Sequence, residues 1–187
     1  MTLNDFLYHL GGIFNGYELV IVLWFIITQF PKYRWSLFYA RHRTLNFLPL
    51  HEMHSCFMSA VIVLFFHAAG SEIEQYLLSF EFEQVMRIRV FYMGMIAQKF
   101  AFIAALYTVH RLRGCLFSKT ARMCLYMSFT YAAFLFVELV VRGYFDYHNF
   151  TPVYRVAAWV CNTAAIAALS IYPIRQTLRY FQKRRVA

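Results

Sequence analysis

The sequence predicts an all-α protein, a polytopic membrane helix bundle with five transmembrane helices in a single domain over residues 1–187. Three observations lead to this prediction. Only 14% of the residues are charged and 61% are hydrophobic, whereas soluble domains carry roughly 25% charged residues. The mean hydropathy is +0.49. The apolar residues form long continuous blocks, and most Lys and Arg residues fall in alternate connections between these blocks.

Five blocks are long enough to span a bilayer, because about 20 helical residues cross roughly 30 Å of hydrocarbon. Their approximate limits are residues 12–30, 47–69, 86–109, 123–142 and 152–172. The blocks are continuous, whereas the strands of a membrane barrel alternate polar and apolar residues over about 10 positions. A helix also satisfies its own backbone hydrogen bonds in lipid. We therefore expect five membrane-spanning helices.

Two segments outside the blocks also show helical patterns. Residues 2–11 place their leucines and phenylalanine on one helical face, which predicts a short interfacial helix before the first span. Apolar side chains repeat at helical spacing ahead of the third block, which predicts that the third helix begins near Glu72. The third block is the least apolar of the five, because Lys99 and two arginines interrupt it. The fifth block is the most apolar, with no charged residue from Val156 to Ile174.

The placement of charge predicts the orientation. Of 18 Lys and Arg residues, four lie in residues 31–43, four in 110–122 and five after Pro173, while residues 71–84 and 143–152 contain none. This is the positive-inside pattern, and it places the N-terminus outside and the C-terminus in the cytoplasm. The pattern favours a bacterial inner (plasma) membrane, with the cytoplasmic bases against anionic lipid headgroups. The same alternation argues against nucleic acid as the partner of a chain with net charge +9.

Polar side chains at membrane depth are the candidate functional residues. At 1.5 Å per residue, Lys99 and Asn162 lie near the midplane, and Glu18 and Glu138 lie in the outer half. A charged side chain at the midplane costs about 2.5–3.5 kcal/mol. We therefore expect Lys99 to pair with Glu18 or Glu138, either along an ion or proton path or as a structural ion pair. The alternative is that Lys99 extends to the membrane surface.

Two further side chains join this set. Arg142 lies four residues after Glu138, so the pair shares a helix face and we expect an ion pair within the helix. His67 ends the second block on the outer side, where it is expected near Glu138 and His148 as a titratable group. Glu18 has no such local partner.

Three histidines form a separate candidate site on the cytoplasmic side. His51 and His54 share a face at the start of the second block, and His110 ends the third block on the same membrane side. Imidazoles at one depth suit zinc or another transition metal, or the axial positions of a haem. Their spacing matches no known ligand signature. We therefore expect no cofactor, and keep a metal or haem at these residues as the lesser alternative.

The predicted function is that of a small membrane protein that assembles into an oligomer or larger membrane complex. Intramembrane charges need partners, and a 187-residue bundle offers few. Its intramembrane charges would conduct or relay ions or protons. The first alternative is a non-catalytic accessory or scaffold subunit, and the second is a haem- or metal-binding membrane protein. The sequence contains no phosphate-binding, dinucleotide-binding, zinc-protease or serine-hydrolase motif, so an enzyme is not favoured.

Overall fold

The computed structural model describes residues 3–39 and 47–186, with side chains at 11–38 and 47–185. These ranges contain helices and no strand. Five helices are long and apolar enough to cross a membrane, which confirms the predicted fold class. They are α1 (Leu3–Tyr33), α3 (Leu48–Leu78), α4 (Gln84–Arg113), α5 (Lys119–Gly143) and α6 (Thr151–Val186); the short helix α2 covers Ser36–Tyr39.

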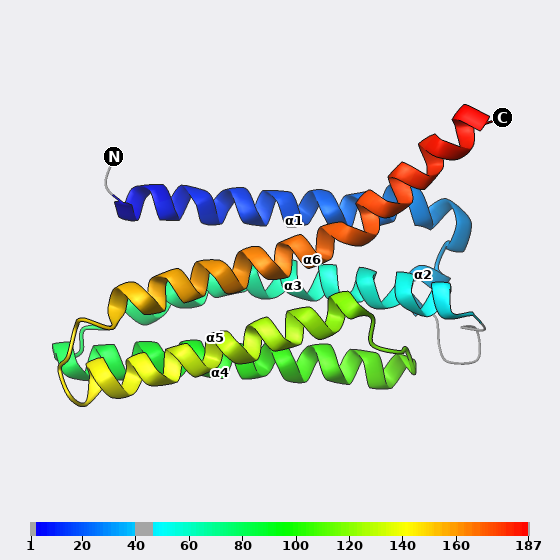
Figure 1. Cartoon of the computed structure of the whole chain (residues 1–187). Coiled ribbons are helices and arrows are strands. Elements are labelled where there is room, and N and C mark those ends of the chain that lie inside the picture. Colours follow the sequence, from blue (N-terminus) through cyan, green and yellow to red (C-terminus); the bar gives the residue numbers. More distant parts are fainter. Residues whose placement is uncertain (1–2, 40–46, 187) are drawn as a thin grey trace.

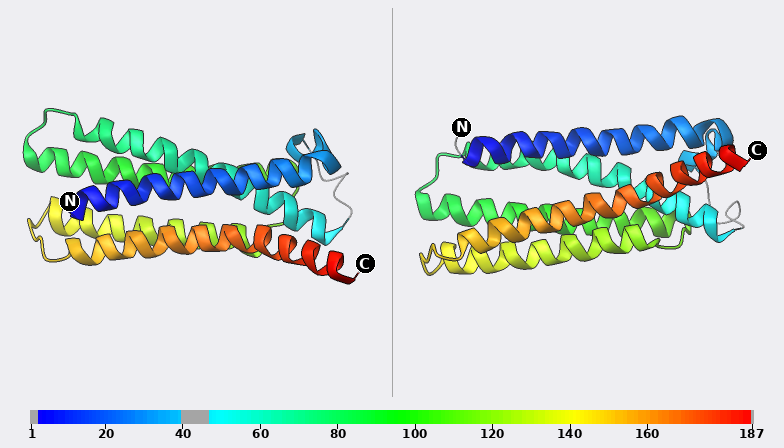
Figure 2. Two further views of the ribbon diagram at one scale, coloured as in Figure 1. Left: turned by 90° about the horizontal axis from the view of Figure 1, so that it is seen from above. Right: turned by 45° about the horizontal axis from the view of Figure 1, so that its top comes forward.

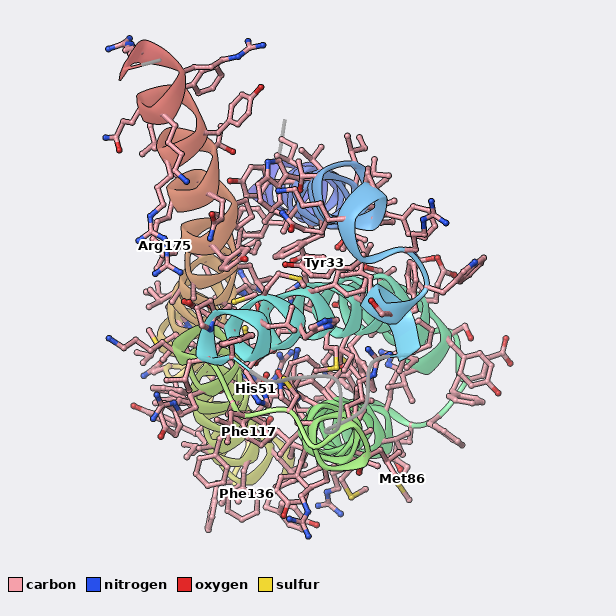
Figure 3. All side chains as sticks on the ribbon, turned by 90° about the vertical axis from the view of Figure 1, so that its right-hand side faces the viewer. Tyr33, His51, Met86, Phe117, Phe136 and Arg175 are labelled. Atoms are coloured by element: carbon pink, nitrogen blue, oxygen red, sulfur yellow. The ribbon has the colours of Figure 1, made fainter. Side chains whose placement is uncertain are left out.

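The five long helices run side by side, and the two chain termini lie at opposite ends of the bundle (Figures 1 and 2). One end holds the start of α1 together with the α3–α4 and α5–α6 connections, and we call it the N-terminal end. The C-terminal end holds the α4–α5 connection and the end of α6. α3 lies between α1 and α4 when the bundle is viewed from the C-terminal end (Figure 3).

Two helix boundaries differ from the prediction. α1 is one continuous helix from Leu3 to Tyr33, and its candidate membrane span begins at Gly11, so residues 3–10 precede that span as part of the same helix. The glycines at 11 and 12 cost a helix interior about 1 kcal/mol each, which does not break it here. The apolar repeat after Glu72 belongs to the end of α3, which runs to Leu78, and α4 begins only at Gln84.

Gly70 explains how α3 continues past its apolar block and still packs closely on α4. A Cβ atom at this position would come within 2.5 Å of the Gln98 amide nitrogen. The same amide donates a hydrogen bond of 2.8 Å to the backbone oxygen of Phe66. Gly70 therefore serves helix contact, which small residues permit in membranes, and does not end the helix.

The C-terminal half of the bundle is packed with apolar side chains. Phe25 and Leu106 are fully buried there, and the Phe25 ring stacks on Tyr172 with a centroid distance of 5.5 Å. These residues belong to one core cluster that also includes Leu37, Phe57 and Leu169. This half of the bundle therefore has an apolar core, although buried polar side chains such as His54, Ser55 and His110 lie at its end.

α6 continues through Pro173, and its last turns leave the bundle (Figure 1). Ile174, Leu178 and Phe181 on this segment are exposed, and five basic residues accompany them. Proline inside a helix removes one backbone hydrogen bond and usually bends the helix. The segment is a basic extension with apolar side chains that no other described element covers.

The predicted orientation can be tested by labelling introduced cysteines. Glu81→Cys lies in the α3–α4 connection and Leu116→Cys in the α4–α5 connection, and both parent side chains are exposed. We expect an impermeant maleimide to label the first in intact cells and the second only after permeabilisation. Labelling of both from the same side would contradict the five-span topology.

The native thiol next to the second position should not interfere with this labelling. Cys115 is buried, and burial raises the pKa of its thiol to about 11. At pH 8 only about one molecule in a thousand then carries the reactive thiolate. Background labelling of Cys115 should increase only as the pH rises towards 11.

Candidate functional site

A cavity of about 900 Å³ occupies the N-terminal half of the bundle, and we call it the vestibule. All five long helices contribute to its wall. Glu72 and Glu74 lie on its exposed part, near the end of α3. Lys99 and Asn162, near the middle of α4 and α6, are its deepest polar residues along the helices. The vestibule thus extends from one end of the bundle to near the middle of α4.

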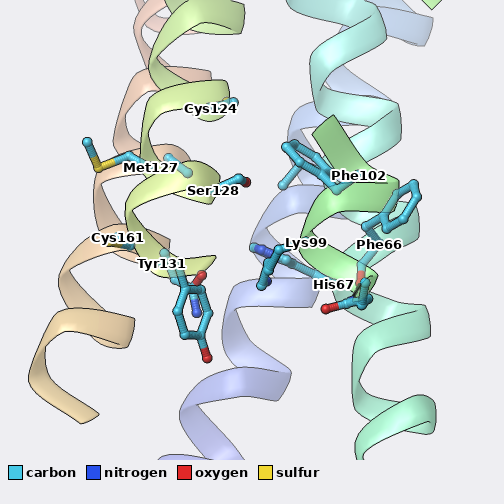
Figure 4. Close-up of a pocket in the computed structure, with 13 residues that line it drawn as sticks. Phe66, His67, Lys99, Phe102, Cys124, Met127, Ser128, Tyr131 and Cys161 are labelled. Carbon is cyan, nitrogen blue, oxygen red and sulfur yellow. Dashed lines mark hydrogen bonds between the residues drawn. The ribbon is translucent and has the colours of Figure 1, made fainter. Parts of the chain in front are cut away.

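Lys99 lies at the inner end of the vestibule and is only 8% exposed. Its ammonium nitrogen is 4.6 Å from the centroid of the Tyr131 ring, a cation–π contact worth about 2 kcal/mol when desolvated. Figure 4 shows Lys99 between Tyr131 of α5 and His67 of α3. A smaller cavity of about 20 Å³, also lined by Asn162, continues from these residues into the bundle.

The predicted ion pairs of Lys99 do not form. Within the described residues, neither Glu18, Glu138 nor any other carboxylate lies within 4.0 Å of its ammonium nitrogen. The side chain also does not extend to the membrane surface, because it is buried and lines the vestibule. Lys99 is therefore a buried cation in contact with an aromatic ring, and Glu18 and Glu74 act on its charge from more than 4.0 Å away.

Glu18 pairs with His67 instead. The two side chains are 2.6 Å apart, from a Glu18 carboxylate oxygen to His67 Nδ1. Glu18 is 1% exposed, and its second oxygen has no hydrogen-bond partner. His67 lines both the vestibule and the smaller cavity, so this pair contacts the same space as Lys99.

The length of α3 explains why His67 was predicted at the outer end of its helix and is found away from that end. The apolar block was expected to end at residue 69, which put His67 at the outer surface near Glu138 and His148. α3 instead continues to Leu78, nine residues further or about 13 Å at 1.5 Å per residue. His67 therefore lies 11 residues before the end of α3, beside Glu18 of α1, and not at the end of the bundle.

Glu138 belongs to a hydrogen-bonded network nearer the N-terminal end. It is fully buried, and one carboxylate oxygen accepts hydrogen bonds from Thr151 Oγ1 at 2.6 Å and from the Tyr92 hydroxyl at 3.4 Å. Arg142 donates to that same tyrosine hydroxyl at 3.3 Å. The expected direct Glu138–Arg142 ion pair is thus replaced by a contact through Tyr92. The network ties α4, α5 and α6 together beside the vestibule.

Tyr92 and Tyr131 are the site residues that the sequence analysis missed. Tyr131 supplies the ring beneath Lys99, and its hydroxyl is 3.4 Å from that of Tyr154, which also lines the vestibule. Tyrosines in apolar blocks resemble ordinary core residues. The available signal was their hydroxyl group, because a buried tyrosine hydroxyl needs a polar partner.

The three histidines of the predicted metal or haem site do not form a cluster. His110 donates through Nδ1 to the backbone oxygen of Leu106 at 2.8 Å, and its Nε2 lies 2.9 Å from Ser55 Oγ. His51 accepts a hydrogen bond from the backbone of Leu116, and His54 packs edge-on against Tyr33. Among the residues with described placement, no three His, Cys, Asp or Glu side chains form a group that could hold a metal ion. A metal or haem at these histidines remains a prediction without a supporting cluster.

Among the described residues, the polar groups of the vestibule lie towards the N-terminal end of the bundle, and an apolar core lies beyond them. The vestibule is lined by Glu72 and Glu74 near the N-terminal end and by Lys99, His67 and Asn162 at its inner end. The apolar core beginning at Val63 and Phe102 closes the vestibule beyond that point.

Family models, curated proteins and solved structures contain no match to this chain.

Proposed function

We propose that this protein relays ions in a membrane, and that small anions enter the vestibule from the N-terminal end and bind at Lys99. One observation carries the proposal: a buried lysine near the middle of α4 lines a cavity and has no carboxylate within 4.0 Å among the described side chains. A buried charge needs a compensating charge or it becomes neutral. Glu18 and Glu74 act on this charge only from a distance, and a mobile anion in the vestibule would contact it directly.

The Glu18–His67 pair supports a relay rather than a static binding site. It lies on the same cavity as Lys99 and contains two groups that exchange protons, joined at 2.6 Å. Ionisable residues buried within membrane helices typically mark ion pathways and proton relays. An anion bound at Lys99 and a proton held by the pair would neutralise each other in the low-dielectric interior.

The closed C-terminal half supports assembly or a second conformation as part of the proposal. In one chain the route ends at a packed core that includes Phe25 and Leu106, so complete transfer requires either opening of this half or a route completed by a neighbouring subunit. We therefore propose that the protein works in a homo-oligomer or with a membrane-protein partner. We also propose a bacterial inner membrane with the vestibule facing outward, an orientation that the distribution of bases supports.

Anion flux from proteoliposomes tests this function. Vesicles containing the protein and loaded with potassium chloride should release chloride faster than protein-free vesicles when valinomycin carries the accompanying potassium. Release of sodium under a matched gradient should not increase. Equal chloride release from both kinds of vesicle would contradict the relay, and a larger increase for sodium would contradict the role of Lys99 as an anion site.

The accessory-subunit alternative has one observation in its favour, the basic extension of α6 beyond Pro173. Its exposed apolar residues are suited to a partner and its bases to anionic headgroups. A chain ending at Pro173 should keep the bundle and the chloride flux but lose association with a partner if the extension is a docking element. Unchanged association after this truncation would argue against the alternative.

A further inference from the structure

A second hollow lies beside the vestibule, along the surface of α6 at the N-terminal end. It has a volume of about 700 Å³, and we call it the lateral groove. Its wall includes the apolar side chains of Val156, Trp159 and Val160 and, nearer the end of the bundle, the arginines Arg142 and Arg155. His148, Thr151 and Pro152 complete the lining. Val156 and Val160 are 65% and 60% exposed, so the apolar part of the groove opens to the side of the bundle, where lipid chains lie.

The two arginines lie at the level where lipid headgroups occur. Arg142 is the penultimate residue of α5, and Arg155 follows the start of α6 by four residues, about 6 Å along the helix. Neither guanidinium has a carboxylate within 4.0 Å among the described residues. Arg142 donates one hydrogen bond, to Tyr92, and its buried Nε has no partner.

Other charges near the groove do not neutralise this pair. Glu138 is fully buried and accepts its hydrogen bonds from Thr151 and Tyr92. Asp146 is paired with His148 at 3.2 Å on the exposed α5–α6 connection. The arginine part of the groove therefore keeps two positive charges at an end of the bundle whose connections contain no base.

We propose that the lateral groove binds an anionic phospholipid of the bilayer, with the phosphate at Arg142 and Arg155 and an acyl chain along Val156, Trp159 and Val160. Guanidinium groups bind phosphate oxygens in pairs of parallel hydrogen bonds, and the apolar wall continues from that point towards the membrane interior. A free phosphate ion would leave this wall unused. The groove shares Arg142, Thr151, Arg155 and Trp159 with the mouth of the vestibule. It does not include Lys99, so lipid binding here does not require an anion at Lys99.

Trp159 provides a direct probe, because it is one of only three tryptophans and lines the groove. In a protein carrying Trp24→Phe and Trp35→Phe, its fluorescence reports contact with brominated acyl chains, which quench indole. The protein is reconstituted in dioleoyl-phosphatidylcholine vesicles with the same minor fraction of either brominated phosphatidylglycerol or brominated phosphatidylcholine. We expect stronger quenching by the anionic lipid, with each arginine contributing about a five-fold preference.

Two charge-matched variants complete the test. Arg142→Gln with Arg155→Gln should abolish the preference, whereas Arg111→Gln with Arg122→Gln, which removes two exposed bases at the opposite end, should preserve it. Arg155→Gln alone, at an exposed side chain, should lower the preference even if the double variant fails to fold. Equal quenching by both lipids in the parent protein would overturn the proposal, as would a preference that survives Arg155→Gln unchanged.

Discussion

Replacing Lys99 with methionine should abolish chloride flux through the reconstituted protein while leaving the bundle folded. The ammonium is the only Lys or Arg charge at the inner end of the vestibule among the described residues, so its removal eliminates the proposed anion site. Lys119→Met is the matched control, because it removes the same charge from an exposed position at the C-terminal end. It should retain the flux of the parent protein.

The effect of Lys99→Met on stability distinguishes a functional lysine from a structural one. Burying the charge costs about 2.5–3.5 kcal/mol, and the contact with the Tyr131 ring returns about 2 kcal/mol. No carboxylate is left unpaired by the change, so the variant should be as stable as the parent or more stable by about 1 kcal/mol. Loss of folding in detergent would show that Lys99 supports the bundle through contacts other than these.

Replacing His67 with phenylalanine should have the opposite consequence and destabilise the bundle by about 3 kcal/mol. The change leaves the Glu18 carboxylate fully buried without its partner at 2.6 Å. Removing only one member of a buried ion pair strongly destabilises a protein, whereas replacing both members by apolar residues is often neutral or stabilising. The double variant Glu18→Leu with His67→Phe should therefore recover most of the lost stability.

Unfolding by titration with sodium dodecyl sulfate provides the free energies for this comparison. Glu52→Gln is a suitable control, since it breaks the Glu52–Arg175 ion pair of 2.7 Å between half-exposed side chains, and exposed pairs contribute about 0–1 kcal/mol. A His67→Phe effect as small as that of the control would mean that Glu18 does not depend on His67.

The class of fold could be predicted from the sequence because it depends on composition and block length alone. Five continuous apolar blocks of about 20 residues permit few other structures in a membrane. The helix ends could not be predicted as well. α3 extends beyond its apolar block because nothing at Gly70 or Glu72 stops it, and polar residues are tolerated in a helix once it leaves the hydrocarbon region.

The sequence predicted which residues belong to the site better than it predicted which of them contact each other. Lys99, Asn162, His67 and Arg142 all line the vestibule, because depth in the membrane can be counted along each helix. Which side chains meet depends on which helices are neighbours and how each is rotated, and a shift of one residue turns a side chain by about 100°. For this reason Glu18 meets His67 and not Lys99, and Glu138 reaches Arg142 only through Tyr92.

The rate at which thiol reagents modify a cysteine at position 162 tests the central claim most directly. Asn162 lines both cavities near Lys99, and Asn162→Cys is placed in a protein whose four native cysteines are replaced by alanine. Two methanethiosulfonates of similar size, one with an anionic sulfonate and one with a cationic trimethylammonium, are added from either side. We predict modification only from the N-terminal side, with the anionic reagent faster, and loss of that difference when Lys99→Met is added. Modification from both sides, or a faster reaction with the cationic reagent, would contradict a one-sided anion path to Lys99.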